Sequence, residues 1–257
     1  MSNFDPLLSL EELTVKAGKK TLVDRVSFNV PRGGIVAVAG GSGSGKTTIG
    51  LSLLRLLPCA LRIRQGRMVF EGRDLLGLSD EEMRRVRGAR IGMVFQEPLS
   101  ALDPLFTIGG QMDEVLAAHT ALSKQERHKK ILSALDEVGL PDPQRAYRSF
   151  PHQLSGGMRQ RASVAQAIVT GPSLIIADEP ASSLDVTLQA KIMELFIRLK
   201  RKNIAILLIA HDLAMIARLA DEIVVLCKGQ AVEQGPVSKV MADPLHEYTK
   251  ALLEAAV

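Results

Sequence analysis

Cysteine is scarce in this chain of 257 residues: only Cys59 and Cys227 occur, far apart and outside any C-x-x-C spacing. We expect both to be reduced, packed thiols rather than a redox pair. Long apolar runs are missing too, since no segment approaches the roughly 18–20 residues needed to cross a bilayer. The first six residues lack the basic and apolar regions of a signal peptide. The sequence therefore predicts a chain that stays in the cytoplasm.

Internal repeats, low-complexity tracts and coiled-coil heptads are also absent. The 32 basic and 28 acidic residues give a formal charge of +4, and the pI is about 9.1. Basic and acidic residues are well mixed along the chain. This mildly basic balance favours contact with an anionic membrane surface over binding to nucleic acid. The densest basic patch, residues 84–90, is expected to be a solvated helix face. The length of 257 residues suits one large α/β domain with a smaller inserted lobe, and 46% hydrophobic residues are enough for its core.

A glycine-rich segment follows residues 35–39, whose apolar and β-branched side chains indicate a buried parallel strand. The segment fits G-x-x-x-x-G-K-[ST], in which backbone N–H groups at a helix N-terminus bind phosphate. Lys46 is expected to reach the β- and γ-phosphates of a nucleotide, and the Thr47 hydroxyl to bind Mg²⁺. A glycine-rich turn without a ligand is the alternative, which the Lys-Thr pair disfavours. The predicted ATP-binding residues are Gly40, Gly41, Ser42, Gly43, Ser44, Gly45, Lys46, Thr47 and Thr48.

Two acidic residues, Asp178 and Glu179, come directly after the apolar run 174–177. Buried carboxylates are costly unless they are paired or bind a metal. The carboxyl end of a parallel strand faces the crevice where α/β sheets bind ligands. We expect Asp178 to bind Mg²⁺, directly or through water, and Glu179 to be the general base for an attacking water. A strand end capped by acids is the alternative, and the phosphate-binding pattern weakens it.

A second helix N-terminus is predicted at Leu-Ser-Gly-Gly, residues 154–157, where small side chains leave the backbone accessible. Ser155 is an N-cap type of residue, and the sequence from Met158 onward is typical of a helix. Two helix N-termini that can bind anions suggest two different phosphate contacts in one chain. An ordinary capped helix is the alternative.

The phosphate-binding pattern, Leu-Ser-Gly-Gly and the acidic pair together resemble the ATP-binding subunit of an ABC transporter. Leu-Ser-Gly-Gly is that family's own motif, and the resemblance covers nearly the whole chain. It implies ATP and Mg²⁺ as cofactors and ATP hydrolysis as the activity. It also implies that Ser155, Gly156 and Gly157 contact the γ-phosphate of ATP held by a partner subunit. Two subunits would then close head to tail around two ATP molecules and reopen after hydrolysis.

Three further positions match the family pattern. Gln96 follows the strand-like run 91–95, and the resemblance implies that it contacts Mg²⁺ and the attacking water. His211 follows another such run, and its imidazole is expected to stabilise charge on the γ-phosphate during transfer. Asp185 belongs to Ser-Ser-Leu-Asp, residues 182–185, which the resemblance places in communication across the dimer. The alternative for Gln96 is a polar surface residue, and the alternative for His211 is a histidine with a structural role. The predicted catalytic residues are therefore Glu179, His211 and Gln96. The predicted metal ligands are Thr47, Gln96 and Asp178. The residues predicted to contact the ATP of the partner are Ser155, Gly156, Gly157 and Asp185.

The predicted fold is α/β, of the P-loop NTPase type. Strand-like runs near 35–39, 91–95, 174–177, 205–209 and 223–226 are expected to form a mostly parallel core sheet. Alternation within residues 8–30 predicts an N-terminal antiparallel β-layer. Ser-x-x-Glu capping boxes begin helices at Ser79 and Ser123. We expect a single ABC-type ATP-binding domain over 1–257, with the ATPase core and β-layer in 1–95 and 162–257. The helical lobe, which carries Leu-Ser-Gly-Gly, is expected at about 97–161.

Segments 95–104, 151–157 and 185–190 narrow the resemblance to the branch of dipeptide, oligopeptide and nickel importers. Segment 246–253 is similar to the closing motif of that branch. This implies a peripheral motor subunit on the cytoplasmic face of the inner membrane. Its implied partners are a second, paralogous ATP-binding subunit, two transmembrane permease subunits and an extracytoplasmic substrate-binding protein. Because the chain stops at Val257 without a longer cysteine-bearing tail, it resembles the compact nickel-type subunits somewhat more.

The chain departs from the family pattern at the expected base-binding position. The family stacks adenine on an aromatic residue in the first β-layer, near Ala17 here, yet no aromatic residue lies between Asp5 and Ser27. We therefore expect weak base recognition and tolerance of GTP.

Two other functions stay open from the sequence. A soluble ABC ATPase not tied to transport should carry coiled coils, zinc insertions or a second ATPase domain, and the sequence shows none of them. An ATP-binding subunit without turnover would be expected to lose Glu179 or His211, and both are present. The sequence does not specify the cargo, the identity of the partners, a homodimer or heterodimer, or whether both ATP sites are active.

Overall fold

The computed structural model describes residues 6–97, 101–182 and 184–255, which divide between two compact units. The first unit is made of Met1–Met83 and Lys200–Val257, and the second of Arg84–Leu199. Among the described residues, every helix is too short or too polar to span a bilayer.

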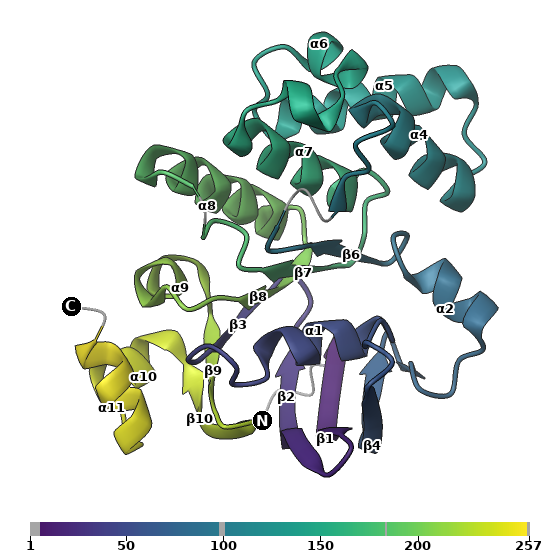
Figure 1. Cartoon of the computed structure of the whole chain (residues 1–257). Coiled ribbons are helices and arrows are strands. Elements are labelled where there is room, and N and C mark those ends of the chain that lie inside the picture. The colour runs from purple at the N-terminus through teal and green to yellow at the C-terminus, as the bar shows by residue number, and fades with distance from the viewer. Residues whose placement is uncertain (1–5, 98–100, 183, 256–257) are drawn as a thin grey trace. The chain divides into compact units, whose positions relative to one another are not determined.

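An antiparallel β-layer lies in the first unit, with the strand order β2-β1-β4-β5 (Figure 1). Leu8 pairs with Val30 and Ala17 with Lys20, so β1 and β2 form the hairpin expected from residues 8–30. The side chains of Leu8, Leu10, Leu13 and Val15 are buried. The strands are β1 (Leu8–Ala17), β2 (Lys20–Val30), β4 (Leu61–Phe70) and β5 (Arg73–Asp74).

Four further strands of the first unit pair in the order β10-β9-β3-β8. Strand β3 is parallel to both β8 and β9, and β10 returns antiparallel to β9. Every residue of β3 and β8 is buried, which explains why these strands are continuous apolar runs. The strands are β3 (Ile35–Ala39), β8 (Ala205–Ile209), β9 (Glu222–Cys227) and β10 (Gln230–Pro236). The helices are α1 (Lys46–Leu53), α9 (Leu213–Leu219), α10 (Val237–Ala242) and α11 (Glu247–Glu254).

The second unit combines a parallel strand pair with a group of helices (Figure 1). Ile91 of β6 pairs with Leu174 of β7. Helix α7 approaches β6 closely at Gly92, where a Cβ atom would lie 2.3 Å from the carbonyl oxygen of Ala167. The strands are β6 (Ile91–Val94) and β7 (Leu174–Asp178). The helices are α4 (Ile108–His119), α5 (Lys124–Glu137), α6 (Pro143–Arg148), α7 (Gly156–Ile168) and most of α8 (Val186–Arg201), with a 3₁₀ turn at Pro151–Gln153.

Both predicted capping boxes are confirmed. At the start of α2 (Asp80–Val86), the backbone N–H of Ser79 donates to Glu82 at 2.9 Å, and the N–H of Glu82 donates to the Ser79 hydroxyl at 3.2 Å. Ser123 and Glu126 form the same reciprocal pair at the start of α5. Each box satisfies backbone donors that a helix N-terminus leaves open.

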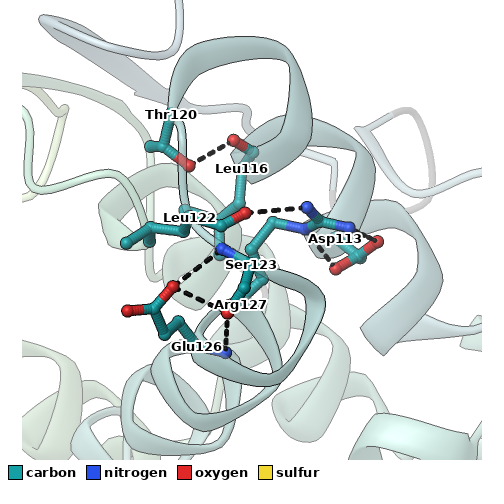
Figure 2. A network of polar contacts seen from close by, with 7 residues as sticks. All are labelled: Asp113, Leu116, Thr120, Leu122, Ser123, Glu126 and Arg127. Atoms are coloured by element: carbon teal, nitrogen blue, oxygen red, sulfur yellow. Dashed lines mark hydrogen bonds and ion pairs between the residues drawn. The ribbon is translucent and has the colours of Figure 1, made fainter.

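A polar network joins α4 to α5 around this second box (Figure 2). Arg127 donates from Nε to Asp113 Oδ1 at 2.7 Å and from Nη2 to Asp113 Oδ2 at 3.1 Å. Its Nη1 also donates to the carbonyl oxygen of Leu122 at 3.0 Å, which holds the α4–α5 connection. The side chains of Arg127 and Asp113 are only 18% and 27% exposed, so solvent screens this two-pronged pair less than a surface pair.

The hydrogen bonds from Arg127 lower the pKa of Asp113 below its usual value. The ionised carboxylate therefore stabilises the folded chain above the unfolded pKa of about 3.9, and this stability is lost as the pH falls through the folded pKa. We expect Asp113→Asn to lower the unfolding temperature at pH 7 by roughly 2–4 °C. The difference should shrink below about pH 4 in thermal scans. Asp136→Asn, at an exposed position of α5, is the matched control; a gap that persists at low pH would contradict the ion-pair explanation.

Candidate functional site

The predicted phosphate loop, residues 40–45, joins the end of β3 to the start of α1 in the first unit. Two of its glycines are required by the backbone. Gly45 is the N-cap of α1 with φ of 105°, a conformation that side chains rarely permit. Gly40 lies so close to β9 that a Cβ atom would be 2.3 Å from the carbonyl oxygen of Leu226. The loop is therefore shaped by close backbone packing against its own sheet.

Lys46 folds back over this loop. Its side chain is buried, and Nζ donates to the carbonyl oxygens of Gly40 at 2.8 Å and Gly41 at 3.0 Å. The neighbouring Ser44 hydroxyl is buried and has no hydrogen-bond partner in the structure. Since buried polar groups are normally paired, a phosphate oxygen would supply what Ser44 lacks. The residues present thus fit a nucleotide phosphate chain.

Three further predicted residues of the first unit follow its strands β3 and β8 in sequence. Thr47 is exposed on the first turn of α1, and Thr48 is half-buried beside it. His211 is exposed and lies two residues after β8. Because Val38 pairs with Ile209, strands β3 and β8 end at the same edge of the sheet. The phosphate loop and His211 therefore leave neighbouring strands on that edge.

The acidic pair lies in the second unit. Asp178 is the last residue of β7 and is 3% exposed, while Glu179 follows with φ of 45°. Gln96, two residues after β6, donates from Nε2 to Glu179 Oε2 at 2.8 Å. Parallel pairing of β6 with β7 thus brings two predicted catalytic side chains into direct contact. An amide fixed on a carboxylate is suited to hold a water molecule between two polar groups.

Helix α7 begins at Gly156, within the Leu-Ser-Gly-Gly segment, where a helix start was predicted. Ser155 is the N-cap, and its hydroxyl accepts from the N–H of Met158 at 3.4 Å. Ser155 and Gly156 are exposed, and a Cβ atom on Gly156 would meet nothing within 4 Å. Gly157 instead packs on Leu188 of α8, where a Cβ atom would lie 2.3 Å from Cδ1. The open helix start that the sequence indicated is present.

Asp185 is exposed, and its carboxylate accepts from the N–H of Leu188 at 2.9 Å, which caps the start of α8. Ser182, from the same Ser-Ser-Leu-Asp segment, donates to the carbonyl oxygen of Glu179 at 3.2 Å. Ser183 lies outside the described residues, as do residues 98–100 of the 95–104 segment. Within the described part, this loop links the acidic pair to the start of α8.

Sequence reasoning missed Gln160, which lies on α7 and is 1% exposed. Its Nε2 donates to the carbonyl oxygen of Pro180 at 2.8 Å. Gln160 therefore connects the Leu-Ser-Gly-Gly helix to the residue that follows Glu179. The only signal available was a polar residue at a helical position between apolar neighbours.

The predicted metal ligands contain few acidic groups. In the described part of the chain, no cluster of three or more His, Cys, Asp or Glu residues is suited to hold a metal ion. Mg²⁺ commonly binds through one or two protein groups together with substrate phosphates. Thr47 in the first unit, and Gln96 and Asp178 in the second, each carry an oxygen ligand of the kind that this mode uses.

Comparison with known proteins finds a matching family model and several similar proteins. The family model for the ABC transporter matches residues 23–182. The dipeptide transport ATP-binding protein DppD of Bacillus subtilis is 42% identical over 97% of this chain and 76% of its own length. DppD of Escherichia coli is 41% identical over 97% and 78% of the two chains. The oligopeptide transport ATP-binding protein OppD of Bacillus subtilis is 41% identical over 96% and 71%.

Solved structures share the fold. A dimeric ATP-binding cassette in a post-hydrolysis state, bound to ADP and Pi, superposes with a TM-score of 0.80 at 28% identity. The match covers 90% of this chain and 98% of that one. The protein cbiO1 of Clostridium perfringens, part of the ABC transporter complex cbiONQ, gives a TM-score of 0.80 at 26% identity over 93% and 92% of the two chains.

Proposed function

The chain belongs to the ABC transporter family, and from this premise we propose that it is the ATP-hydrolysing motor of a bacterial importer for peptides. The observation that carries the proposal is the 42% identity to a dipeptide transport ATP-binding protein over 97% of the chain. The ADP and Pi bound to the post-hydrolysis cassette neighbour support ATP as the nucleotide. Neither a soluble ABC ATPase nor a subunit without turnover is favoured by these relatives.

For nucleotide binding, we propose that residues 40–48 surround the phosphates of ATP. Lys46 is already aimed across the loop, and the unpaired hydroxyl of Ser44 offers a further contact. Thr47, Asp178 and Gln96 would hold Mg²⁺, which when bound neutralises charge on the phosphates. Hydroxyl, carboxylate and amide oxygens are the hard ligands that this cation prefers.

For hydrolysis, we propose Glu179 as the general base that orients and deprotonates the attacking water. The hydrogen bond from Gln96 supports this role, since it fixes the carboxylate beside an amide that can contact the same water. His211 would hydrogen-bond the γ-phosphate from the first unit and stabilise charge in the loose transition state. The three roles are therefore distinct, because Glu179 accepts a proton, Gln96 orients the carboxylate and water, and His211 stabilises charge.

For assembly, we propose a head-to-tail pair in which Ser155, Gly156, Gly157 and Asp185 contact ATP held by the partner. The exposed N-terminus of α7 supports this, because it offers backbone N–H groups and a positive dipole end to an anion. A paralogous ATP-binding subunit, two permease subunits and an extracytoplasmic substrate-binding protein complete the proposed importer. The chain would work at the cytoplasmic face of the inner membrane.

The test is uptake of a labelled dipeptide and of labelled nickel in the native host, with Glu179→Gln replacing the wild-type chain. We expect dipeptide uptake to be lost and nickel uptake to be kept. Glu194→Gln, an exposed carboxylate on α8, is the matched control and should support normal uptake. Loss of nickel uptake alone would make the chain the motor of a metal importer. If neither uptake changed, the proposed transport function would be wrong.

Base selectivity follows from the β-layer. Ala17 ends β1 half-buried, opposite Lys20 and Leu61, and the aromatic rings Phe28 and Phe70 of this layer are buried. We expect kcat/KM for ATP and GTP to differ by less than about tenfold, since one discriminating contact is worth about 1–2 kcal/mol. Ala17→Tyr should lower the KM for ATP about tenfold, because base stacking contributes about 1–3 kcal/mol.

The matched control for this substitution is Lys16→Tyr, since neighbouring strand residues point to opposite faces of the layer. It should leave the KM unchanged. A strong preference of the wild type for ATP would show that another group reads the base.

A further inference from the structure

The side chain of Tyr248, on α11, reaches the phosphate loop from the far end of the chain. Its hydroxyl accepts a hydrogen bond from the backbone N–H of Gly41 at 2.9 Å, across 207 positions in sequence. The contact is close, since a Cβ atom on Gly41 would lie 3.1 Å from the same hydroxyl. Tyr248 lies outside the matched residues 23–182 and outside the predicted site.

The hydrogen-bonded N–H belongs to the peptide unit between Gly40 and Gly41. The carbonyl oxygen at the other end of this unit, on Gly40, accepts from Lys46 Nζ at 2.8 Å. Tyr248 and Lys46 therefore hold opposite ends of one peptide plane. A peptide flanked by two glycines rotates easily, because neither residue has a Cβ atom to restrict it. An outside contact is thus what fixes the direction of the carbonyl that receives Lys46.

The start of α11, which carries Tyr248, is itself held in place. Glu233 of β10 accepts from the N–H of Leu245 at 2.8 Å and from the N–H of His246 at 3.0 Å, just before α11. Burial raises the pKa of Glu233, but the hydrogen bonds that its carboxylate accepts outweigh this effect and lower the pKa below the usual value. His246 Nδ1 then accepts from the N–H of Tyr248 at 3.1 Å and caps α11. The start of α11 is therefore anchored to β10 by a carboxylate that stays ionised.

We propose that Tyr248 is a positioning residue for ATP binding. Its hydroxyl fixes the Gly40–Gly41 peptide, so that Lys46 is aimed across the loop before the nucleotide arrives. Such pre-organisation lowers the ordering cost of binding. Tyr248 acts through Gly41 and Lys46 and needs no contact with the nucleotide. The proposal rests on the ATP site proposed above and adds the C-terminal segment to it.

The first test compares Tyr248→Phe with Tyr147→Phe, the matched change at the other tyrosine of the chain. Tyr147 is in the second unit, where its ring meets His128 edge to face. We expect Tyr248→Phe to raise the KM for ATP about fivefold, the factor for one neutral hydrogen bond. The kcat should stay near the wild-type value, because turnover begins after the loop is filled. Tyr147→Phe should change neither parameter.

A purely structural role would give a different result, namely a lower unfolding temperature of the nucleotide-free protein with an unchanged KM. That result would overturn the proposal, as would a loss of kcat at constant KM. Glu233→Gln is the second variant, because it weakens the anchor of α11 without touching the loop. It should raise the KM in the same direction by a smaller factor. If the wild type itself failed to bind MgATP, the proposed function would fail, whereas wild-type binding with an unaffected Tyr248→Phe variant rejects only the positioning role.

The second test uses tyrosine emission, since the chain has no tryptophan and only two tyrosines. In Tyr147→Phe, Tyr248 is the single emitting residue. Titration with tripolyphosphate and Mg²⁺, which do not absorb in the tyrosine band, should give a saturable change in emission. The midpoint should match the concentration that inhibits ATP hydrolysis, and Lys46→Ala should remove the change. A failure of tripolyphosphate to inhibit ATP hydrolysis would count against the phosphate site itself.

Discussion

Glu179→Gln is expected to slow ATP hydrolysis by about 10²–10⁴-fold, the usual contribution of a general base. The amide cannot accept the proton of the attacking water, yet it has almost the same shape as the carboxylate. Its oxygen can still accept from Gln96 Nε2, which donates to Glu179 at 2.8 Å in the wild type. We therefore expect the dissociation constant for ATP to stay within about threefold of the wild-type value, since phosphate contacts are unchanged.

Phosphate release and calorimetric titration with MgATP measure the two quantities separately. Glu194→Gln on α8 again provides the matched control, with wild-type values expected for both. Turnover close to that of the wild type would remove Glu179 from the role of base. A large loss of ATP affinity would instead indicate that the carboxylate acts mainly in holding the nucleotide or its metal ion.

Lys46→Ala is expected to weaken ATP binding about 100-fold, because it removes charge-assisted hydrogen bonds in a buried setting. The ammonium group lies over the loop, where it already bonds the carbonyl oxygens of Gly40 and Gly41. Without it, those two oxygens lose a donor, and the phosphates lose the nearest positive charge. The change should appear as a higher dissociation constant in titrations with MgATP.

The matched control for this loop variant is Lys239→Ala, an exposed lysine on α10 of the same unit. It should bind ATP as the wild type does. An affinity of Lys46→Ala within about threefold of the wild type would show that backbone N–H groups alone hold the phosphates. Taken with Glu179→Gln, this variant separates binding from turnover, since each is expected to change only one of them strongly.

The parts of the fold that the sequence predicted are those with strong local signals. The run 35–39 is wholly buried in β3, and the glycines after it allow the turn into α1. Strand β4 was missed because Arg62, Arg64 and Arg67 interrupt the apolar pattern of Leu61–Phe70. Its pairing partner is β1, some fifty residues earlier, so the hydrogen bonds that make it a strand are not local. Strand β10 was missed for another reason, because none of its residues is buried and it therefore lacks an apolar run, although its partner β9 is adjacent in sequence.

The candidate site divides in a similar way. Gln96 and Glu179 were each predicted from a polar residue after an apolar run, while their 2.8 Å contact depends on the pairing of β6 with β7. Gln160 and Tyr248 were not predicted, since each bonds a backbone group far away in sequence. A hydrogen bond with a backbone group does not require a particular residue type at the partner position, so no sequence motif reveals it. Contacts of this kind become visible only when the fold is known.

The backbone conformation of Glu179 implies a trade-off between stability and activity in the evolution of this protein. At φ of 45°, the residue occupies the left-handed region, which for a side chain other than glycine costs about 1–2 kcal/mol. Glycine or asparagine would relieve that strain, so the most heat-resistant variants at this position would be inactive ones. Selection for thermal stability alone would therefore favour replacement of Glu179 by a residue without a carboxylate. With Glu179 in the proposed role of general base, its presence would mean that selection for activity has outweighed selection for stability at this position.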